Sequence, residues 1–315
     1  MSAPARKALN SRVAGRARLQ LAVYIRGHWQ RLCCEAIRKN RNTNIFYSMK
    51  RFSHLRVCLK FVVLIFVSLV VAETVADDQT IARLFVQRNV EGTLVLSSLR
   101  GGQTFVHNTF RAQQRFAAAS TFKIFNTLIS LEEQVISGKD APLKWDGHIY
   151  DIPDWNRDQT LETAFKVSCV WCFQELARRI GSETYRNYIR SAKYGLLHEP
   201  FNQTEFWLDG DLEISAIEQV DFLKKVYTRS LPFSPATYET LRQIMRVEQT
   251  PAYSLWAKTG WATRINPQVG WYVGYVETLS DVWFFAANMV IHDQKDLPLR
   301  RQLTLDALKA SGVIQ

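Results

Sequence analysis

Two pairs of segments, one in each half of the chain, have the composition of β-strands. Both pairs are rich in β-branched and aromatic residues. A short turn divides each pair, Gly101-Gly102 in the first and Leu279-Ser280-Asp281 in the second. Because glycine, serine and aspartate favour tight turns, each pair is typical of a β-hairpin. The four predicted strands are 93–99, 103–108, 269–277 and 282–290.

The region between the two hairpins is predicted to be mostly helical. Segments with helical periodicity alternate there with loops of Gly, Pro and Asn. A further helix, 299–310, follows the second hairpin and has Leu303, Leu305 and Leu308 as apolar positions. This order predicts an α+β fold (an α/β sandwich), in which an antiparallel sheet forms from both chain ends around an inserted helical region. The other predicted helices are 120–136, 170–180, 183–192, 215–228 and 235–246.

Positive charge is concentrated in the first 60 residues. They contain 14 Lys and Arg side chains and a single acid, Glu35, whereas the whole chain has a net charge of +11. The remaining 255 residues therefore carry a net charge of −2. Because that part is nearly neutral, we expect no basic surface for nucleic acid and no nucleic-acid partner.

An apolar run, 61–72, follows the basic segment. Its twelve residues are too few to span a bilayer. Lysine and arginine side chains precede the run between Lys50 and Lys60, and small residues follow it up to Ala76. A basic stretch, a short apolar stretch and a small-residue exit are typical of a secretory signal peptide.

This pattern divides the chain into three parts. Met49 stands where a signal peptide should begin, and it is the only methionine between Met1 and Met245. We expect translation to start there, which gives a secreted or periplasmic protein without a stable membrane anchor. The alternative is a genuine basic arm that stays on the mature protein. The predicted parts are an upstream extension at 1–48, a signal peptide at 49–76 and a folded domain at 77–315.

Two cysteines, Cys169 and Cys172, follow the predicted cleavage point, whereas Cys33, Cys34 and Cys58 precede it. Cys-x-x-Cys spacing is typical of a redox pair or half of a zinc site. The chain offers no second pair and no neighbouring histidine, so we expect no metal site. We interpret the two cysteines as small core residues. A strained disulfide is the alternative.

The tetrapeptide 120–123 carries the first candidate chemistry. Ser120 and Lys123 are three residues apart, so on a helix they share one face. At a helix start, unpaired N–H groups and the positive end of the helix dipole favour developing negative charge on the serine. A neutral lysine in reach of the hydroxyl would be its base. The alternative is an ordinary helix lysine that extends into solvent.

Two further motifs add to this pair. Ser168-x-Val170 places a second hydroxyl at a predicted helix start, where the alternative is a simple N-cap. Lys258-Thr259-Gly260 combines a cation, a hydroxyl and a glycine that allows a ligand to approach the backbone. A cation beside a hydroxyl suits a substrate carboxylate.

The three motifs, in this order, resemble the serine β-lactamase and penicillin-binding superfamily. The middle motif reads Ser-x-Val rather than Ser-Asp-Asn, which resembles class D β-lactamases, the oxacillinases. The tract 263–267 resembles the loop of their carbapenem-hydrolysing branch, and the resemblance runs from about residue 80 to the C-terminus. One departure is Leu196, which stands where the family usually has asparagine after Tyr-Gly. Other stretches that resemble the family are 144–147, 155–158, 206–210 and 257–261.

The resemblance implies a serine hydrolase that opens β-lactams through an acyl-enzyme on Ser120. The backbone N–H groups of Ser120 and Trp261 would form the oxyanion hole. Lys123 would react with CO₂ or bicarbonate to become N6-carboxylysine, the general base, and no other cofactor is implied. That reaction needs a neutral amine, and burial against apolar groups lowers the pKa of lysine. The expected neighbours are Phe122, Val170, Trp207 and Leu208, with the Trp207 indole N–H donating to the carbamate.

The same resemblance assigns roles to the remaining polar residues. Ser168 would relay a proton to the leaving nitrogen, supported by the charge of Lys258. Thr259 and Arg300 would bind the substrate carboxylate, with Arg264 as a weaker candidate. The residues assigned to substrate binding are Val170, Trp207, Leu208, Thr259, Gly260, Arg300, Arg264 and Trp155.

Several of these residues also have plain structural interpretations. Trp207 is a candidate for core packing, Arg300 for a solvated helix charge and Trp155 for a surface aromatic. Glu175 and Asp209 resemble catalytic carboxylates in composition, but we interpret both as structural charges.

Four functions are consistent with these features. The first is a secreted class D β-lactamase that acts on small β-lactam molecules, in a family whose members often pair as homodimers. The second is a β-lactam sensor domain that is acylated without turnover. The third is a cell-wall transpeptidase or carboxypeptidase, against which Ser-x-Val argues. The fourth is a basic-arm binding protein with an inactive catalytic fold.

Overall fold

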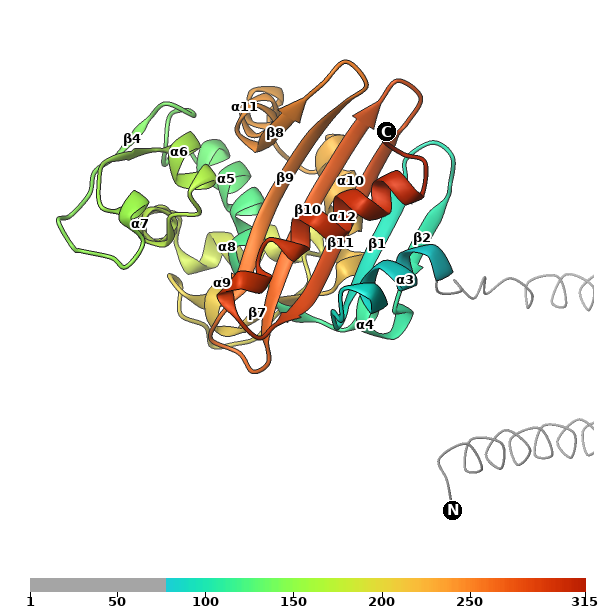
Figure 1. Cartoon of the computed structure of the whole chain (residues 1–315). Helices are drawn as coiled ribbons and strands as arrows, with labels where there is room; N and C mark the ends of the chain where they lie inside the picture. Colours follow the sequence, from blue (N-terminus) through green and yellow to red (C-terminus); the bar gives the residue numbers. More distant parts are fainter. Residues whose placement is uncertain (1–77) are drawn as a thin grey trace, which may run out of the picture. The chain divides into compact units, whose positions relative to one another are not determined.

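A six-stranded antiparallel sheet is the framework of residues 78–315, the part of the chain that the computed structural model describes (Figure 1). The spatial order is β2-β1-β11-β10-β9-β8, so strands from the two ends of the domain are neighbours. The prediction of one antiparallel sheet built from both ends is confirmed. The strands are β1 (Gly92–Ser98), β2 (Thr104–His107), β8 (Arg246–Gln249), β9 (Tyr253–Ala262), β10 (Gln268–Thr278) and β11 (Val282–Ile291).

The central strands are apolar along their whole length because helices cover both faces of the sheet. Every residue of β11 is buried, and it pairs with β1 from Gly92↔Met289 to Ser98↔Trp283. A strand buried on both faces has no solvent side that would require alternation of polar residues. The predicted strand boundaries agree with the observed ones to within one or two residues at each end.

One face of the sheet is covered by the first and last helices, α3 (Gln79–Gln87) and α12 (Leu299–Ala310), which Figure 1 shows side by side over the strands. Phe85 of α3 and Leu303 of α12 belong to one buried cluster with Phe285 of β11. The helix predicted at 299–310 is confirmed with the same boundaries.

The inserted region covers the other face. Predicted helices 170–180, 183–192, 215–228 and 235–246 are present with ends shifted by at most one residue. The predicted helix 120–136 is instead a 3₁₀ turn followed by a shorter helix that ends at Glu132. The helices are α4 (Thr109–Gln113), η1 (Ala119–Phe122), α5 (Lys123–Glu132), α6 (Leu161–Lys166), α7 (Val170–Ile180), α8 (Ser182–Ala192), α9 (Phe206–Asp209), α10 (Ala216–Tyr227) and α11 (Pro235–Met245).

Short strands and turns complete the described part. A three-stranded sheet has the order β3-β7-β6, and within it Leu196 pairs with Glu213. The minor elements are β3 (Phe116–Ala117), β4 (Pro142–Leu143), η2 (Pro153–Trp155), β5 (Gln159–Thr160), β6 (Leu196–Leu197), β7 (Leu212–Ile214) and η3 (Gln294–Asp296).

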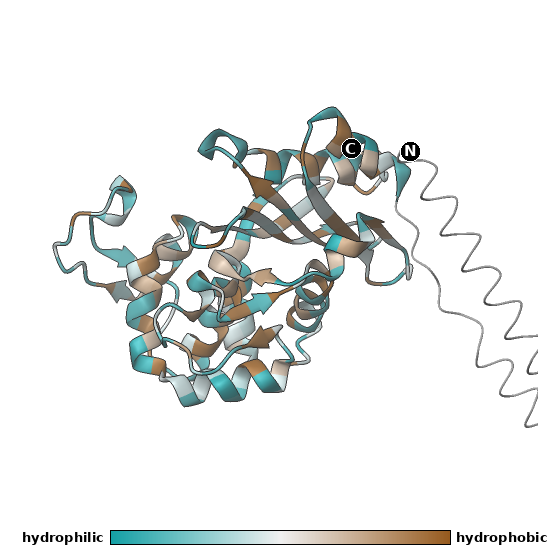
Figure 2. Cartoon of the chain, turned by 90° about the horizontal axis from the view of Figure 1, so that it is seen from below, coloured by the Kyte–Doolittle hydropathy of each residue, from teal (hydrophilic) through white to brown (hydrophobic). Residues whose placement is uncertain are grey.

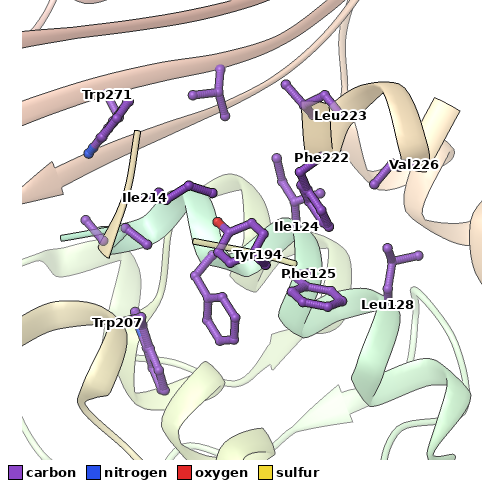
Figure 3. Packing of buried hydrophobic residues seen from close by; sticks show 14 of the residues in the cluster. Ile124, Phe125, Leu128, Tyr194, Trp207, Ile214, Phe222, Leu223, Val226 and Trp271 are labelled. Carbon is purple, nitrogen blue, oxygen red and sulfur yellow. The ribbon is translucent and has the colours of Figure 1, made fainter. Parts of the chain in front are cut away.

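An aromatic cluster surrounds α5 at the centre of the helical layer. Figure 3 shows Phe125, Tyr194 and Phe222 close together beside Ile124. Phe122 stacks on Trp207 with ring centroids 5.7 Å apart. Figure 2 shows the corresponding pattern in colour, with brown stretches in the strands and alternating brown and teal along the helices. Because α5 is enclosed by these rings, its first residues are held away from water.

No helix within residues 78–315 is long and apolar enough to cross a membrane. The predicted extension at 1–48, the signal peptide at 49–76 and the three cysteines before residue 60 lie outside the described residues.

Candidate active site

Ser120 and Lys123 lie at the junction of η1 and α5, and η1 packs against β9. The Lys123 Nζ donates a hydrogen bond to the Ser120 Oγ at 2.9 Å. The residue before the serine, Ala119, has a left-handed backbone (φ 48°), which is strained for a residue with a Cβ. The predicted pairing of hydroxyl and amine on one helical face is therefore present in the structure.

The Lys123 side chain is fully buried. Burial lowers the pKa of its amine to about 7, because a charged ammonium is poorly solvated there. The Nζ lies 5.1 Å from the centroid of the Phe173 ring, which is not among the neighbours expected from the sequence. The reading of Lys123 as a solvent-exposed helix lysine is wrong.

Trp207 is also fully buried, and it stacks on Phe122, the residue before Lys123. Its indole Nε1 has no hydrogen-bond partner among the described residues. An unpaired buried donor is destabilising by about 1–3 kcal/mol, so it is an unusual feature of a folded protein. This N–H is able to donate a hydrogen bond to a group placed beside it.

Ser168 and Lys258 form a second hydroxyl–amine pair. The Lys258 Nζ donates to the Ser168 Oγ at 2.9 Å and to the Thr259 carbonyl at 2.9 Å. Burial lowers the pKa of Lys258 well below its ordinary value, and the charges of Lys123 and Arg300 lower it further. The two pairs therefore lie close enough for their amines to interact.

Ser168 is not the N-cap of α7. Its backbone is left-handed (φ 58°), and Cys169 is the residue that caps the helix. The alternative of a simple capping serine is therefore wrong. The hydroxyl is free of the helix end and bonds instead to Lys258.

Cys169 and Cys172 form a disulfide, which corrects our interpretation of them as small core residues. The first turn of α7 brings positions three apart to one face, with Cα atoms 5.5 Å apart, a separation that a disulfide can bridge. Both cysteines are fully buried. The bridge lies immediately after Ser168 in the chain.

Gly260 is required by close packing between η1 and β9. A Cβ at this position would lie 3.0 Å from the Thr121 Cγ2 and 3.1 Å from the Trp271 Cβ. Thr121 is fixed in turn, because it donates to the Ala118 carbonyl and accepts from the Gln219 Nε2 at 2.7 Å. The glycine thus allows the serine turn to lie directly on the strand that carries Lys258 and Trp261.

Arg300 extends from α12 to the same strand. Its Nη1 donates to the Gly260 carbonyl at 2.6 Å and its Nε to the Leu297 carbonyl at 2.8 Å. Burial lowers the pKa of the guanidinium to about 10. The reading of Arg300 as a solvated helix charge is wrong, and its cation lies at the strand edge beside Thr259 and Gly260.

Three other sequence-predicted residues have structural partners. Arg264 is exposed and forms an ion pair with Glu205 at 3.3 Å. The Trp155 Nε1 donates to the Val167 carbonyl at 3.0 Å, so this half-buried ring is anchored beside the Ser168 turn. The Trp261 indole donates to the Gln268 side chain at 3.0 Å, which orients the side chain.

The remaining predicted residues also have structural positions or partners. Val170 begins α7, and Leu208 lies in α9 against the main core. Glu175 forms ion pairs with Arg178 and Arg179 on the exposed face of α7, as expected for a structural charge. Within residues 78–315 no group of three or more His, Cys, Asp or Glu side chains could hold a metal ion.

Three contacts that fix the site were not identified from the sequence. Phe173 contacts Lys123, and Thr121 contacts Gly260. The Trp271 Nε1 donates to the Ala117 carbonyl at 3.0 Å, in the segment before η1. Thr121 occupies a variable position within Ser-x-x-Lys, so the motif does not specify it. The assembled groups provide a nucleophilic hydroxyl, an amine with a lowered pKa and a second hydroxyl with its own amine, which suits acyl transfer.

The chain matches known proteins over most of its length. The family model described as penicillin binding protein transpeptidase domain matches residues 92–309. Beta-lactamase OXA-48 of Klebsiella pneumoniae is 41% identical over 230 residues, which cover 73% of this chain and 87% of that protein. The regulatory protein BlaR1 of Bacillus licheniformis is 36% identical over 243 residues, which cover 76% of this chain but 40% of that protein.

Solved structures agree with this similarity. The class D β-lactamase YbXI from Nostoc is 40% identical with a TM-score of 0.72, covering 74% of this chain and 98% of that one. The class D β-lactamase FUS-1 (OXA-85) from Fusobacterium nucleatum is 35% identical with a TM-score of 0.74, covering 76% of this chain and all of that one. The chain therefore belongs to the class D β-lactamases, serine hydrolases within the penicillin-binding transpeptidase superfamily.

Proposed function

We propose that this protein hydrolyses β-lactams through an acyl-enzyme on Ser120, with N6-carboxylated Lys123 as the general base. The observation that carries the proposal is the fully buried Lys123 amine, 2.9 Å from the Ser120 Oγ. Since its pKa is about 7, roughly half of the amine is neutral at neutral pH and able to react with CO₂.

Two features of the site fit a carbamate on Lys123. The unpaired Nε1 of Trp207 would donate a hydrogen bond to it. An anion here would also replace the repulsion between the Lys123 and Lys258 amines by attraction. Carboxylation supplies an anionic base beside the nucleophile, and every other part of the mechanism is carried by the chain itself.

In acylation the Ser120 Oγ gives its proton to the general base at Lys123 and attacks the lactam carbonyl. The backbone N–H groups of Ser120 and Trp261 would stabilise the oxyanion, a contribution of about 3–4 kcal/mol for one donor in comparable sites. As the lactam C–N bond breaks, Ser168 passes its proton to the nitrogen and regains one from Lys258 through their hydrogen bond. The proton taken from Ser120 then passes from the base to Lys258, which frees the base for deacylation. Thr259 and Arg300 hold the substrate carboxylate. Water then attacks the ester and releases Ser120.

Lys123→Ala tests this proposal. The variant should fold and be acylated slowly by a chromogenic cephalosporin, and it should fail to turn over, because the base that acts in both acylation and deacylation is missing. In the wild type, ¹³C-bicarbonate should give a carbamate signal in ¹³C NMR, and added bicarbonate should raise the rate. Lys139→Ala, which changes a lysine paired with Asp140, is the matched control and should keep both properties. Full turnover by Lys123→Ala would contradict the proposed base.

A sensor domain that is acylated without turnover is the second candidate. The similarity to the regulatory protein BlaR1 favours it. Rapid mixing with the same cephalosporin distinguishes the two, because a sensor gives one equivalent of product and then stops. Continuous hydrolysis supports the enzyme.

A further inference from the structure

A cavity of about 410 Å³ opens beside Lys258 and Thr259, where β9 extends beyond its partner strand. β8 pairs with β9 only from Gln249↔Ser254 to Arg246↔Trp256, with a register shift near its start. The edge of β9 beyond Trp256 therefore has no strand beside it within the described sheet. Side chains from α6, α11, β8, β10 and α12 surround the resulting space.

The lining of this cavity is cationic. Lys166, Arg246, Lys258 and Arg301 line it, and no Asp or Glu does. Lys166 pairs with Glu162 at 2.6 Å, and Arg301 lies 3.4 Å from Glu248, both outside the lining.

Arg246 and Lys258 have no acidic partner within residues 78–315. The Arg246 Nη1 bonds to the neutral Gln249 side chain, and Lys258 bonds to hydroxyl and carbonyl oxygens. A concave site lined by one sign of charge attracts a ligand of the opposite sign.

A buried hydroxyl adds a donor to this lining. Tyr272, on β10, is 3% exposed, and its hydroxyl has no hydrogen-bond partner among the described residues. Burial raises the pKa of this phenol to about 12, so it remains protonated at neutral pH. The hydroxyl is therefore able to donate a hydrogen bond to a ligand in the cavity.

The cavity adjoins the proposed substrate site, because Lys258 and Thr259 belong to both. In a cephalosporin the C3 substituent is attached to the ring carbon next to the one that carries the carboxylate. If Thr259 and Arg300 hold that carboxylate, as the proposed function requires, the C3 substituent lies beside Thr259, at the entrance to the cavity.

We propose that this cavity is a subsite for a second negative charge, carried by the C3 substituent of dianionic cephalosporins. The inference rests on the proposed function for the position of the ring carboxylate. Arg246 and Arg301 provide charge, and the Tyr272 hydroxyl provides an oriented donor. Its volume is enough for one acidic heterocycle, and apolar side chains of α6 and α11 would cover the ring faces.

Two cephalosporins with the same acyl side chain test the subsite. Cefotaxime has a neutral acetoxymethyl group at C3, whereas ceftriaxone has an acidic triazine. The measured quantity is the ratio of kcat/KM for ceftriaxone to kcat/KM for cefotaxime. Arg246→Ala and Arg301→Ala should each lower this ratio about tenfold, because one charge-assisted contact is lost. Tyr272→Phe keeps the ring and should lower it severalfold. High salt should lower the wild-type ratio.

The control removes an arginine elsewhere. Arg229→Ala changes a residue paired with Glu239, outside this cavity, and should leave the ratio unchanged. If either compound is hydrolysed too slowly, its inhibition constant against a chromogenic cephalosporin replaces kcat/KM. If Arg246→Ala changes kcat/KM equally for both compounds, the proposed subsite is wrong, whereas the proposed β-lactam hydrolysis is unaffected. Absence of hydrolysis of the chromogenic substrate by the wild type would overturn the proposed function instead.

Discussion

A buried, uncompensated lysine makes the site both reactive and destabilising. The Lys123 amine has a pKa of about 7 in the folded protein and an ordinary lysine pKa in the unfolded chain. Between these two values the unfolded chain binds a proton that the folded chain has lost, so stability rises with pH across that window. Below pH 7 both states are protonated, and the folded state carries the full cost of the buried charge.

Lys123→Met should therefore stabilise the protein in the absence of CO₂. Methionine fills a similar volume without a charge, so we expect the free energy of unfolding at pH 6 to rise by roughly 4 kcal/mol, with the difference shrinking toward pH 10. Urea unfolding at pH 6, 8 and 10 in CO₂-free buffer measures this. If the difference in unfolding free energy between the variant and the wild type does not change with pH, the Lys123 amine is not the cause of the destabilisation. Turnover should be lost in this variant, as expected when stability and activity conflict.

Individual residues differed in how far the sequence could identify them. Ser120 and Lys123 lie within one turn, so local spacing predicted their contact, and Ser168 and Lys258 follow from recognised motifs. The Phe173 contact depends on how α7 packs on α5, which local spacing does not determine. The disulfide was underestimated because Cys-x-x-Cys spacing has several common meanings.

At the scale of elements, the position of the nucleophile depends on the contact between η1 and β9. Helices and strands with strong periodicity were predicted within one or two residues. The exception is the helix predicted to start at the nucleophile, which begins as a 3₁₀ turn whose first residue is the strained Ala119. Periodicity cannot reveal such a turn, because the strain is maintained by packing against the sheet.

Gly260→Ala should therefore separate two elements that must touch. The added methyl group would meet the Thr121 Cγ2 at 3.0 Å and the Trp271 Cβ at 3.1 Å, so η1 must move away from β9. A displacement of the Ser120 turn relative to Trp261 by a few tenths of an ångström should lower kcat/KM severalfold with a small change in Tm. Steady-state kinetics with a chromogenic cephalosporin and thermal unfolding measure the two quantities. Gly138→Ala is the control, since no atom lies within 4 Å of its added Cβ. Similar effects of both substitutions would contradict this account.

At the scale of the whole molecule, the strands that complete the sheet come from opposite ends of the domain. β1 and β11 pair over seven residue positions, and the helices α3 and α12 seal the same face. All proposed catalytic side chains lie between residues 120 and 300. The fold class was predictable because hairpin, helical insertion and hairpin follow one another clearly in the chain. The order of strands in the sheet was not, since pairing between distant segments leaves no local pattern.

Residues 1–76 should be dispensable for catalysis. The folded part carries its own closed core and nearly balanced charge, whereas the basic segment and the apolar run have the pattern of an export signal. A chain that starts at residue 77 should have the same kcat and KM as the full chain, with its Tm unchanged within about 2 °C. N-terminal sequencing of protein secreted by a bacterial host should give a first residue between 73 and 77. A mature protein that retains residues 1–48 and loses activity when they are removed would favour the basic-arm alternative. In that case the basic segment would contribute to the activity of the folded domain.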